Sequence, residues 1–182
     1  MDIQYTILGL LNWQSLSGYD LKKIIAESEL FYWSGNNNQI YNRLIELHKQ
    51  RLVSQVIIQQ ESLPAKKIYT ITETGREVLH QWLLSELELP EFRNNFLIKL
   101  AWTDELSGDE LDALLARYAE EINIQLKMRS TLINRSPAAP NRTQRERFLW
   151  IRIEQNMLSM YQRELEWVNR LRQDLREQNY NE

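Results

Sequence analysis

The sequence predicts a mainly α-helical protein in two parts, and three observations support this. Apolar residues recur at helical spacing along most of the 182 residues. Gly and Pro are scarce, at 5 and 4 residues, whereas a linker-rich chain contains many more of both. A single β-favouring segment, 52–72, interrupts the helical pattern, and Pro90 breaks it again at mid-chain. We therefore expect two domains, 1–89 and 90–182.

The composition predicts a cytoplasmic protein without metal or cofactor. The chain has no cysteine, which excludes disulfides and thiolate metal sites. His48 and His80 lie on different predicted helices with no carboxylate at ligand spacing. No apolar run approaches the roughly 20 residues that cross a bilayer, and the sequence opens on an amphipathic rather than a basic signal segment. Because phosphate loops, serine elbows and zinc spacings are also missing, we expect neither an enzyme nor a membrane protein.

Three short helices are predicted in tandem at the start of the chain. Apolar spacing predicts the first over 3–12, and a capping box at Ser17 and Asp20 begins the second, which runs from 18 to about 29. The turn-rich segment 34–38 opens the third helix. The core face of this third helix is formed by Ile40, Leu44 and Leu47.

A β-hairpin and a fourth helix follow. The stretches 52–59 and 66–72 are β-favouring and Pro64 lies between them, so they predict two paired strands. Thr72 or Thr74 can cap a helix that continues to about Leu89. The order helix, helix, helix, strand, strand, helix is that of a winged helix-turn-helix with a two-stranded wing.

The second half is predicted to be helical throughout. A fifth helix is expected over 92–102, and a capping box at Ser107 and Glu110 begins a sixth that ends near Ile133. Pro137 and Pro140 separate it from the stretch 141–178, which contains neither Gly nor Pro. These 38 residues span roughly 57 Å as a helix.

The last helix carries an apolar stripe at spacings of three and four residues. Its members are Met157, Tyr161, Leu165, Val168, Leu171 and Leu175. Because the helix is longer than a compact domain of this size can cover, we expect a second copy of the chain to cover the stripe. The sequence therefore predicts an obligate homodimer with a long-helix dimerisation domain.

The outward face of the third helix is the candidate functional surface. Amides can pair with adenine edges, and cations reach guanine or phosphate, although a solvated helix face has the same composition. Its position as third helix of this fold favours a major-groove role. The wing lysines are included in the set, although lysines on an edge strand can instead serve to prevent aggregation. The candidate DNA-binding residues are Asn37, Asn38, Gln39, Tyr41, Asn42, Arg43, Lys49, Lys66 and Lys67. Ile45 shares the face, and Tyr69 is expected to pack beneath the hairpin.

The overall charge of the chain does not favour binding to DNA. The net charge is -3, and residues 1–72 contain seven Lys and Arg against six Asp and Glu. DNA affinity must therefore come from local placement of charge.

Six tryptophans are many for this length. Core and interface packing accounts for most of them, because large rings dominate buried area. The other interpretation is a flat aromatic ligand near the dimer interface, stacked on Trp102 or Trp150.

Four segments of the first half resemble the PadR family of bacterial transcriptional regulators. They are Ile7–Leu11, Ser17–Leu21, Gln39–Leu44 and Lys67–Gly75. From Phe92–Trp102 onward, the second half resembles the helical domain of the PadR branch related to the virulence activator AphA. The four segments occur in the family's order and spacing, which makes a chance match improbable.

The resemblance implies a winged-helix dimer whose long C-terminal helix crosses its counterpart and packs near the first helix. Family members usually repress their targets and often release DNA on binding a small aromatic molecule. By resemblance, residues 38–43 match the DNA-reading motif, with Tyr41 at a recurrent tyrosine, and Lys66 and Lys67 match the basic wing. Many members have proline and glycine where this chain has Asn42 and Arg51, so a target sequence cannot be transferred.

Two functions therefore remain open. The first is a sequence-specific regulator, a repressor, that binds a palindromic duplex as a homodimer and is released by a small aromatic effector. The alternative is a ligand-binding or protein-interaction module that keeps a winged helix but does not read DNA.

Overall fold

The computed structural model describes residues 3–27, 38–59, 65–87, 89, 94–135 and 143–178. The chain divides into two compact units, Met1–Glu88 and Leu89–Glu182. Among the described helices, none is long and apolar enough to cross a membrane.

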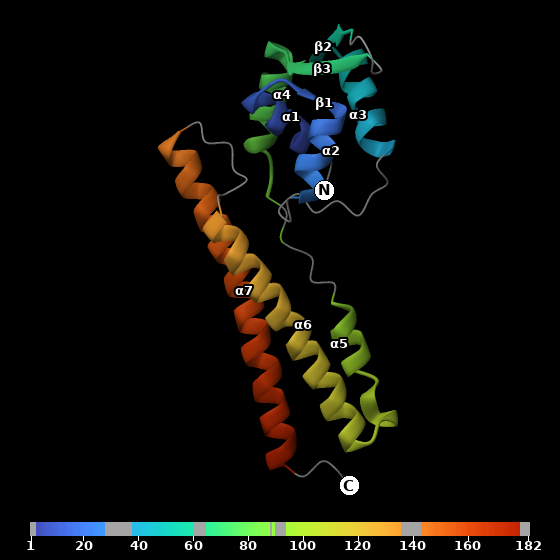
Figure 1. Cartoon of the computed structure of the whole chain (residues 1–182), viewed down its shortest axis with the longest axis vertical. Helices are drawn as coiled ribbons and strands as arrows, with labels where there is room; N and C mark the ends of the chain where they lie inside the picture. Colours follow the sequence, from blue (N-terminus) through green and yellow to red (C-terminus); the bar gives the residue numbers. More distant parts are fainter. Residues whose placement is uncertain are drawn as a thin grey trace. The chain divides into compact units, whose positions relative to one another are not determined.

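The first unit follows the order of a winged helix (Figure 1). Its elements are α1 (Ile3–Trp13), β1 (Leu16–Ser17), α2 (Gly18–Glu27), α3 (Asn38–Lys49), β2 (Val53–Ile58), β3 (Lys66–Ile71) and α4 (Glu73–Leu83). The mainly α winged-helix fold is thereby confirmed. The predicted third-helix start at 34–37 and the second-helix end at 28–29 lie outside the described residues.

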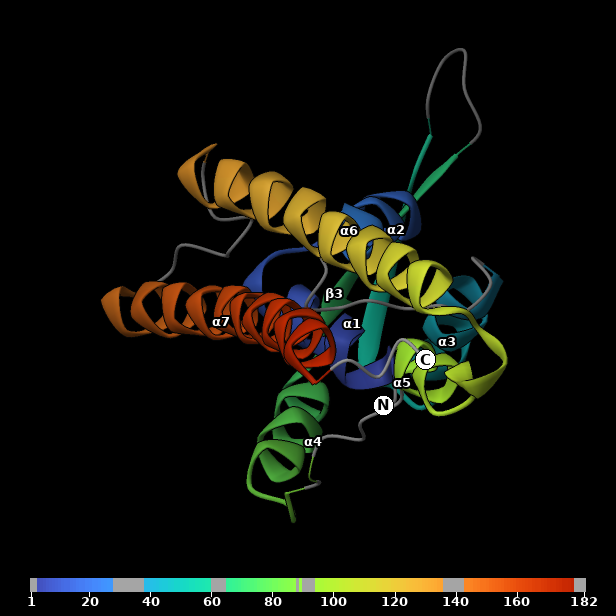
Figure 2. The same ribbon diagram turned by 90° about the horizontal axis from the view of Figure 1, so that it is seen from below.

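The sheet has one strand more than the sequence predicted. Its order is β1-β3-β2 and both pairings are antiparallel, with Leu16 opposite Tyr69 and Val53 opposite Ile71. The β2–β3 hairpin is the predicted wing, whose outer half extends beyond the helices of its unit in Figure 2. β1 was missed because two residues are too short to show an alternating pattern.

The core of this unit is formed by the apolar stripes of its helices and the inner half of the sheet. Its fully buried members are Ile7, Leu8, Leu21, Leu44, Leu47 and Val53. Farther along the hairpin the side chains are exposed, at 62% for Val56 and 52% for Ile57. Only the base of the wing is therefore held by the core.

Polar caps fix where α2 and α4 begin. The Ser17 hydroxyl accepts from the Asp20 N–H at 3.2 Å, and Asp20 Oδ2 accepts from the Ser17 N–H at 3.2 Å, which is the predicted capping box. Thr72, rather than Thr74, caps α4, because its Oγ1 accepts from the Gly75 N–H at 3.1 Å. The same hydroxyl donates to the Arg51 carbonyl at 2.8 Å, which joins α4 to the turn after α3.

The fourth helix is shorter than predicted. The apolar pattern continues to Leu89, but α4 ends at Leu83, where the Leu84 N–H bonds back to the Gln81 and Trp82 carbonyls. Leu84 and Leu87 are 75% and 94% exposed. The apolar side chains beyond Leu83 do not join the core of their unit, so the helical pattern alone did not extend α4.

The second unit is a long helical hairpin preceded by a short helix (Figure 1). Its elements are α5 (Asn95–Leu100), the 3-10 turn η1 (Thr103–Glu105), α6 (Gly108–Arg135) and α7 (Gln144–Glu177). Asn94 caps α5 by accepting from the Phe96 N–H at 2.9 Å, so the helix is shorter than the predicted 92–102. The predicted box at Ser107 and Glu110 precedes α6, and Thr143 caps α7.

Helices α6 and α7 lie side by side, and their contact corrects the argument made from the apolar stripe. Val168 is fully buried, and Leu165, Leu171 and Leu175 pack on the same cluster, whose buried members also include Phe96 and Leu115. The chain's own helices thus bury Val168 fully and the other three stripe residues in part. An intramolecular helix thus satisfies part of the apolar spacing for which the sequence analysis expected a second copy. Their dimerisation role remains a prediction.

Candidate nucleic-acid interface

The third helix presents the predicted polar face to solvent. Its apolar side is buried, with Ile40 at 3% and Leu44 and Leu47 at 0% exposed. The opposite side carries exposed residues of the candidate set, namely Gln39, Tyr41, Asn42 and Lys49, together with Ile45. Asn37 lies outside the described residues, and Asn38 is placed only as the first residue of α3.

The end of α3 is closed by a residue in an unfavourable backbone conformation. The Leu52 N–H bonds to the Leu47 carbonyl at 2.9 Å, and the Arg51 N–H bonds to the His48 carbonyl at 3.0 Å. This double closure is a Schellman motif, which requires a left-handed residue and usually has glycine there. Arg51 takes that role with φ 61°. The turn thus keeps the shape that glycine favours while carrying a cationic side chain.

Tyr41 is positioned by the start of α2. A Cβ atom added to Gly18 would meet the Tyr41 ring, so the missing side chain lets the ring lie against the backbone. Tyr41 remains 42% exposed. Gly18 therefore matters to the orientation of a candidate DNA-contacting ring, a role that sequence analysis did not assign.

Arg43 is held by an acidic neighbour on the same helix. Its Nη1 lies 2.8 Å from Glu46 Oε2. The two side chains line a shallow groove with Gln39 and Asn42, next to Ile3 of α1. Sequence analysis missed Glu46 because it selected residues whose chemistry suits DNA, although the i, i+3 spacing to Arg43 predicts the pair.

The two wing lysines have different surroundings. Lys66 Nζ lies 3.2 Å from Asp20 Oδ2, so this lysine links β3 to the capping box of α2. The hydrogen bond from the Ser17 hydroxyl is the main reason that the pKa of Asp20 lies below its ordinary value, and Lys66 lowers it further. Lys67 is exposed. Lys66 thus connects two elements of the unit, whereas Lys67 remains a candidate surface residue.

Tyr69 packs beneath the hairpin, as predicted. It is 5% exposed, and burial, followed by the proximity of Tyr41, raises the pKa of its hydroxyl. It is therefore part of the core rather than of the outward surface.

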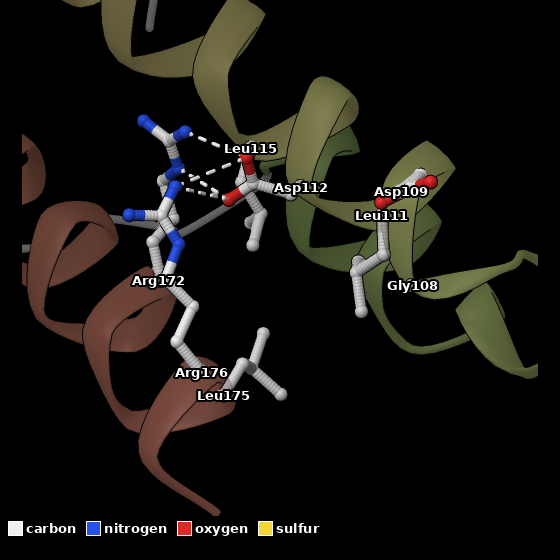
Figure 3. A pocket seen from close by; sticks show the side chains of 8 residues that line it. All are labelled: Gly108, Asp109, Leu111, Asp112, Leu115, Arg172, Leu175 and Arg176. Carbon is white, nitrogen blue, oxygen red and sulfur yellow. Dashed lines mark hydrogen bonds and ion pairs between the residues drawn. The ribbon is translucent and has the colours of Figure 1, made fainter. Parts of the chain in front are cut away.

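In the second unit, one carboxylate joins the two long helices. Asp112 of α6 accepts from Arg172 Nε at 3.0 Å and Nη2 at 2.9 Å, and from Arg176 Nη2 at 3.2 Å. Figure 3 shows both guanidinium groups directed at this carboxylate, with Leu111 and Leu175 nearby. The Arg172 hydrogen bonds are the main reason that the pKa of Asp112 is lowered.

A second polar network lies where α5, α6 and α7 meet. Glu164 Oε1 accepts from the Tyr118 hydroxyl at 2.8 Å and from Asn94 Nδ2 at 3.2 Å. Burial raises the pKa of Tyr118 to about 12. Asn94 and Glu164 border an open groove of about 550 Å³ that is also lined by Met157, Met160, Tyr161, Arg163 and Trp167.

The two candidate ligand-stacking tryptophans do not line the groove described above. Trp102 is 78% exposed, Trp150 is half-buried, and neither lines the groove beside Trp167. Of the predicted stripe, Met157 and Tyr161 are half-buried, and Tyr161 accepts from Arg129 Nη2 at 2.9 Å. Within the described residues, no cluster of three metal-ligating side chains occurs.

Comparison with known families accounts for both units. The model of the Transcriptional regulator PadR-like family matches residues 7–81, and that described as Virulence activator alpha C-term matches residues 92–176. The chain is 33% identical over 129 residues to the negative transcriptional regulator PadR of Bacillus subtilis, which covers 68% of this chain and 71% of that protein.

Solved structures show the same architecture. Bacillus subtilis PadR in complex with operator DNA has a TM-score of 0.80 at 25% identity, covering 93% of this chain and 95% of that chain. The same regulator in complex with p-coumaric acid has a TM-score of 0.66 at 25% identity, covering 92% and 98%. The Vibrio cholerae virulence activator AphA shares the fold, with a TM-score of 0.69 at 24% identity and coverage of 97% and 99%.

Proposed function

Because the chain belongs to the transcriptional regulator PadR-like family, we propose that it is a sequence-specific DNA-binding regulator whose α3 enters the major groove. The observation that carries the proposal is the exposed polar face of α3, with Gln39, Asn42 and Lys49 opposite a fully buried apolar side. Side-chain amides can read adenine edges, and cations can reach guanine or phosphate. A PadR relative of the same fold has been solved with operator DNA.

Selection of bound fragments from the source genome tests this function. We expect a small set of roughly palindromic fragments, because two symmetry-related α3 helices about 34 Å apart would occupy successive major grooves. If about six phosphates are neutralised, log affinity falls against log salt with a slope near -5. Asn42→Ala should reduce discrimination between selected and scrambled duplexes. No enrichment at any salt concentration would contradict the proposal.

We further propose that the regulator acts as a homodimer through its second unit. Large apolar side chains remain exposed there on α5 and along α7. They include Leu97, Ile98, Phe148, Leu149, Ile151 and Met160. Such a concentration of apolar surface is typical of an interface, and two-fold pairing is the commonest way to cover it. Sedimentation across the concentration range of operator binding should give a dimer, and a stable monomer would contradict this step.

Negative regulation relieved by a small aromatic molecule is the regulatory mode that we propose. The support is the negative regulator PadR as a relative and its complex with p-coumaric acid. Trp102 and Trp150 are the proposed stacking residues, and the groove beside Trp167 offers another indole. A panel of aromatic compounds should change tryptophan fluorescence and release operator DNA. Trp102→Phe, Trp150→Phe and Trp167→Phe then identify the responding side chain, and no response to any compound would contradict the mode.

One observation favours the alternative, a module that binds ligand or protein without reading DNA. Arg43 and Lys66 are both paired with acidic side chains, and Lys and Arg exceed Asp and Glu by only seven to six in residues 1–72. Fragment selection separates the two functions, because only the regulator enriches specific sequences.

A further inference from the structure

Glu46 is an acidic residue on a surface where DNA binding calls for neutral or cationic groups. It is the one Asp or Glu in the α3 sequence Asn38–Lys49. Its side chain is 53% exposed, so burial does not account for its presence. At 100° per residue, Glu46 lies close to Asn42 on the helical wheel and therefore borders the proposed reading face.

The partner of Glu46 is the cation best suited to recognising guanine. Arg43 Nη1 lies 2.8 Å from Glu46 Oε2, and the side chain of Arg43 is 30% exposed. The shared groove with Gln39 and Asn42 brings both charges beside the amides of the same face. A guanidinium held by a carboxylate is a weaker partner for phosphate than an unpaired one, because its charge is already compensated.

We propose that Glu46 is a specificity-determining residue that holds Arg43 on α3 until a base edge of the correct sequence replaces the carboxylate. The inference rests on the proposed DNA-reading function. On a wrong sequence, Arg43 stays paired and Glu46 repels the phosphates, so non-specific affinity is kept low. On the operator, paired acceptors such as guanine O6 and N7 can compensate for the loss of Glu46. Discrimination is thereby gained by weakening the wrong complex.

Four proteins test the inference: the wild type, Glu46→Gln, Arg43→Gln and the double variant. Each is titrated with a fragment from the genomic selection and with a scrambled duplex of equal length, over a range of salt. For Glu46→Gln, we expect affinity for the scrambled duplex to rise about five- to tenfold at 0.1 M salt and its salt slope to steepen by about 0.9, as one added phosphate contact requires. Operator affinity should change less, so the specificity ratio falls. In the Arg43→Gln background, Glu46→Gln should steepen the slope much less, because no guanidinium is released to reach a phosphate.

Glu73→Gln is the matched control. Glu73 also pairs with an arginine three residues away, at 3.8 Å from Arg76 Nε, but on α4. Glu73→Gln changes the net charge by the same amount as Glu46→Gln. An equal effect of both substitutions on scrambled-duplex binding would mean that overall charge alone is responsible and would overturn the inference. Melting temperatures of all variants establish that each is folded.

The remaining outcomes separate the inference from the function on which it rests. If the wild type prefers no fragment over its scrambled duplex, the proposed function fails and the role of Glu46 fails with it. If the wild type discriminates but Glu46→Gln leaves scrambled-duplex affinity and slope unchanged, only the role of Glu46 is overturned. A loss confined to operator affinity also overturns it, since Glu46 would then accept a hydrogen bond from a base itself.

Discussion

The aromatic ring of Tyr41 lies so close to Gly18 that a methyl group placed on this glycine would come within 2.6 Å of the ring carbon Cε1. Since Tyr41 is 42% exposed, the ring can turn toward solvent to relieve the overlap. We therefore expect Gly18→Ala to change the unfolding free energy by less than about 1 kcal/mol. Operator affinity should nevertheless fall about tenfold, because the displaced ring no longer presents its hydroxyl to DNA.

Gly75→Ala is the contrasting variant. A Cβ there would overlap the backbone carbonyl oxygen of Leu52 and press on Ile71, and backbone cannot turn aside. We expect a loss of about 2 to 3 kcal/mol in chemical denaturation, as for overpacked cores. Equal losses of stability in both variants would show that Gly18 serves folding rather than the orientation of Tyr41.

Replacement of Arg51 by glycine should stabilise the protein. At φ 61° the Cβ of Arg51 crowds its own backbone, and relief of this strain outweighs the extra freedom that glycine gives the unfolded chain. The expected gain in unfolding free energy is about 0.5 to 1 kcal/mol by urea denaturation. Arg51→Ala keeps the Cβ and removes the charge, so it should give no gain. A gain of similar size in the alanine variant would point to charge repulsion instead of backbone strain.

Substitutions of the two wing lysines should have different effects on the salt dependence of operator binding. For the exposed Lys67, substitution by Gln is expected to reduce the salt slope of operator binding by about 0.9, the value for one phosphate contact. Lys66→Gln should change this slope less and lower the melting temperature more, because Lys66 Nζ joins the hairpin to Asp20 at 3.2 Å. Fluorescence anisotropy at several salt concentrations, with a melting curve for each variant, measures both effects. Identical slopes for the two variants would contradict the division of roles.

Low pH should reduce the folding stability of the second unit, because the Asp112 carboxylate becomes protonated. Hydrogen bonds from Arg172, aided by Arg176, lower the pKa of this carboxyl in the folded state. The resulting stability is present above the ordinary pKa of 3.8 and is lost as the pH falls through the lowered folded value. Asp112→Asn should thus cost up to about 1 kcal/mol at pH 7, a modest value because the side chain is partly exposed, and the cost should shrink below about pH 4.

Asp109→Asn is the control for this acid dependence. Asp109 lies on the same turn of α6 but apart from the two guanidinium groups in Figure 3. Urea denaturation at several pH values should give a smaller and less pH-dependent difference for this variant. A cost for Asp112→Asn that stays constant from pH 7 to pH 3 would rule out the ion pair as its source.

Local capping signals predicted the starts of α2 and α6, because such signals depend on neighbouring residues alone. Ser17 with Asp20 and Ser107 with Glu110 form the two expected capping boxes. Features set by distant packing were harder to predict. The leucines after Leu83 keep a helical spacing, yet they are exposed and the helix ends. Their spacing along the chain does not reveal that they lie outside the core of their unit.

In the candidate interface and the long helices too, features set by neighbouring residues were predicted and features set by distant packing were not. The buried and exposed sides of α3 follow from its periodicity, and the structure has both as expected. The partner of Val168 did not follow, because a helix of the same chain and a helix of a second chain satisfy one apolar spacing equally well. Glu46 was missed for another reason. Residues were chosen by their affinity for DNA, which leaves out those that restrain their neighbours.

The burial of Val168 against α6 also affects subunit exchange between proposed homodimers. Within the proposed homodimer, a subunit that departs keeps its helical hairpin intact, since the hairpin's core belongs to one polypeptide. Exchange then exposes only the outer apolar surface and needs no refolding. Two sister regulators in one cell, if their outer surfaces match, could form mixed pairs that recognise hybrid operators.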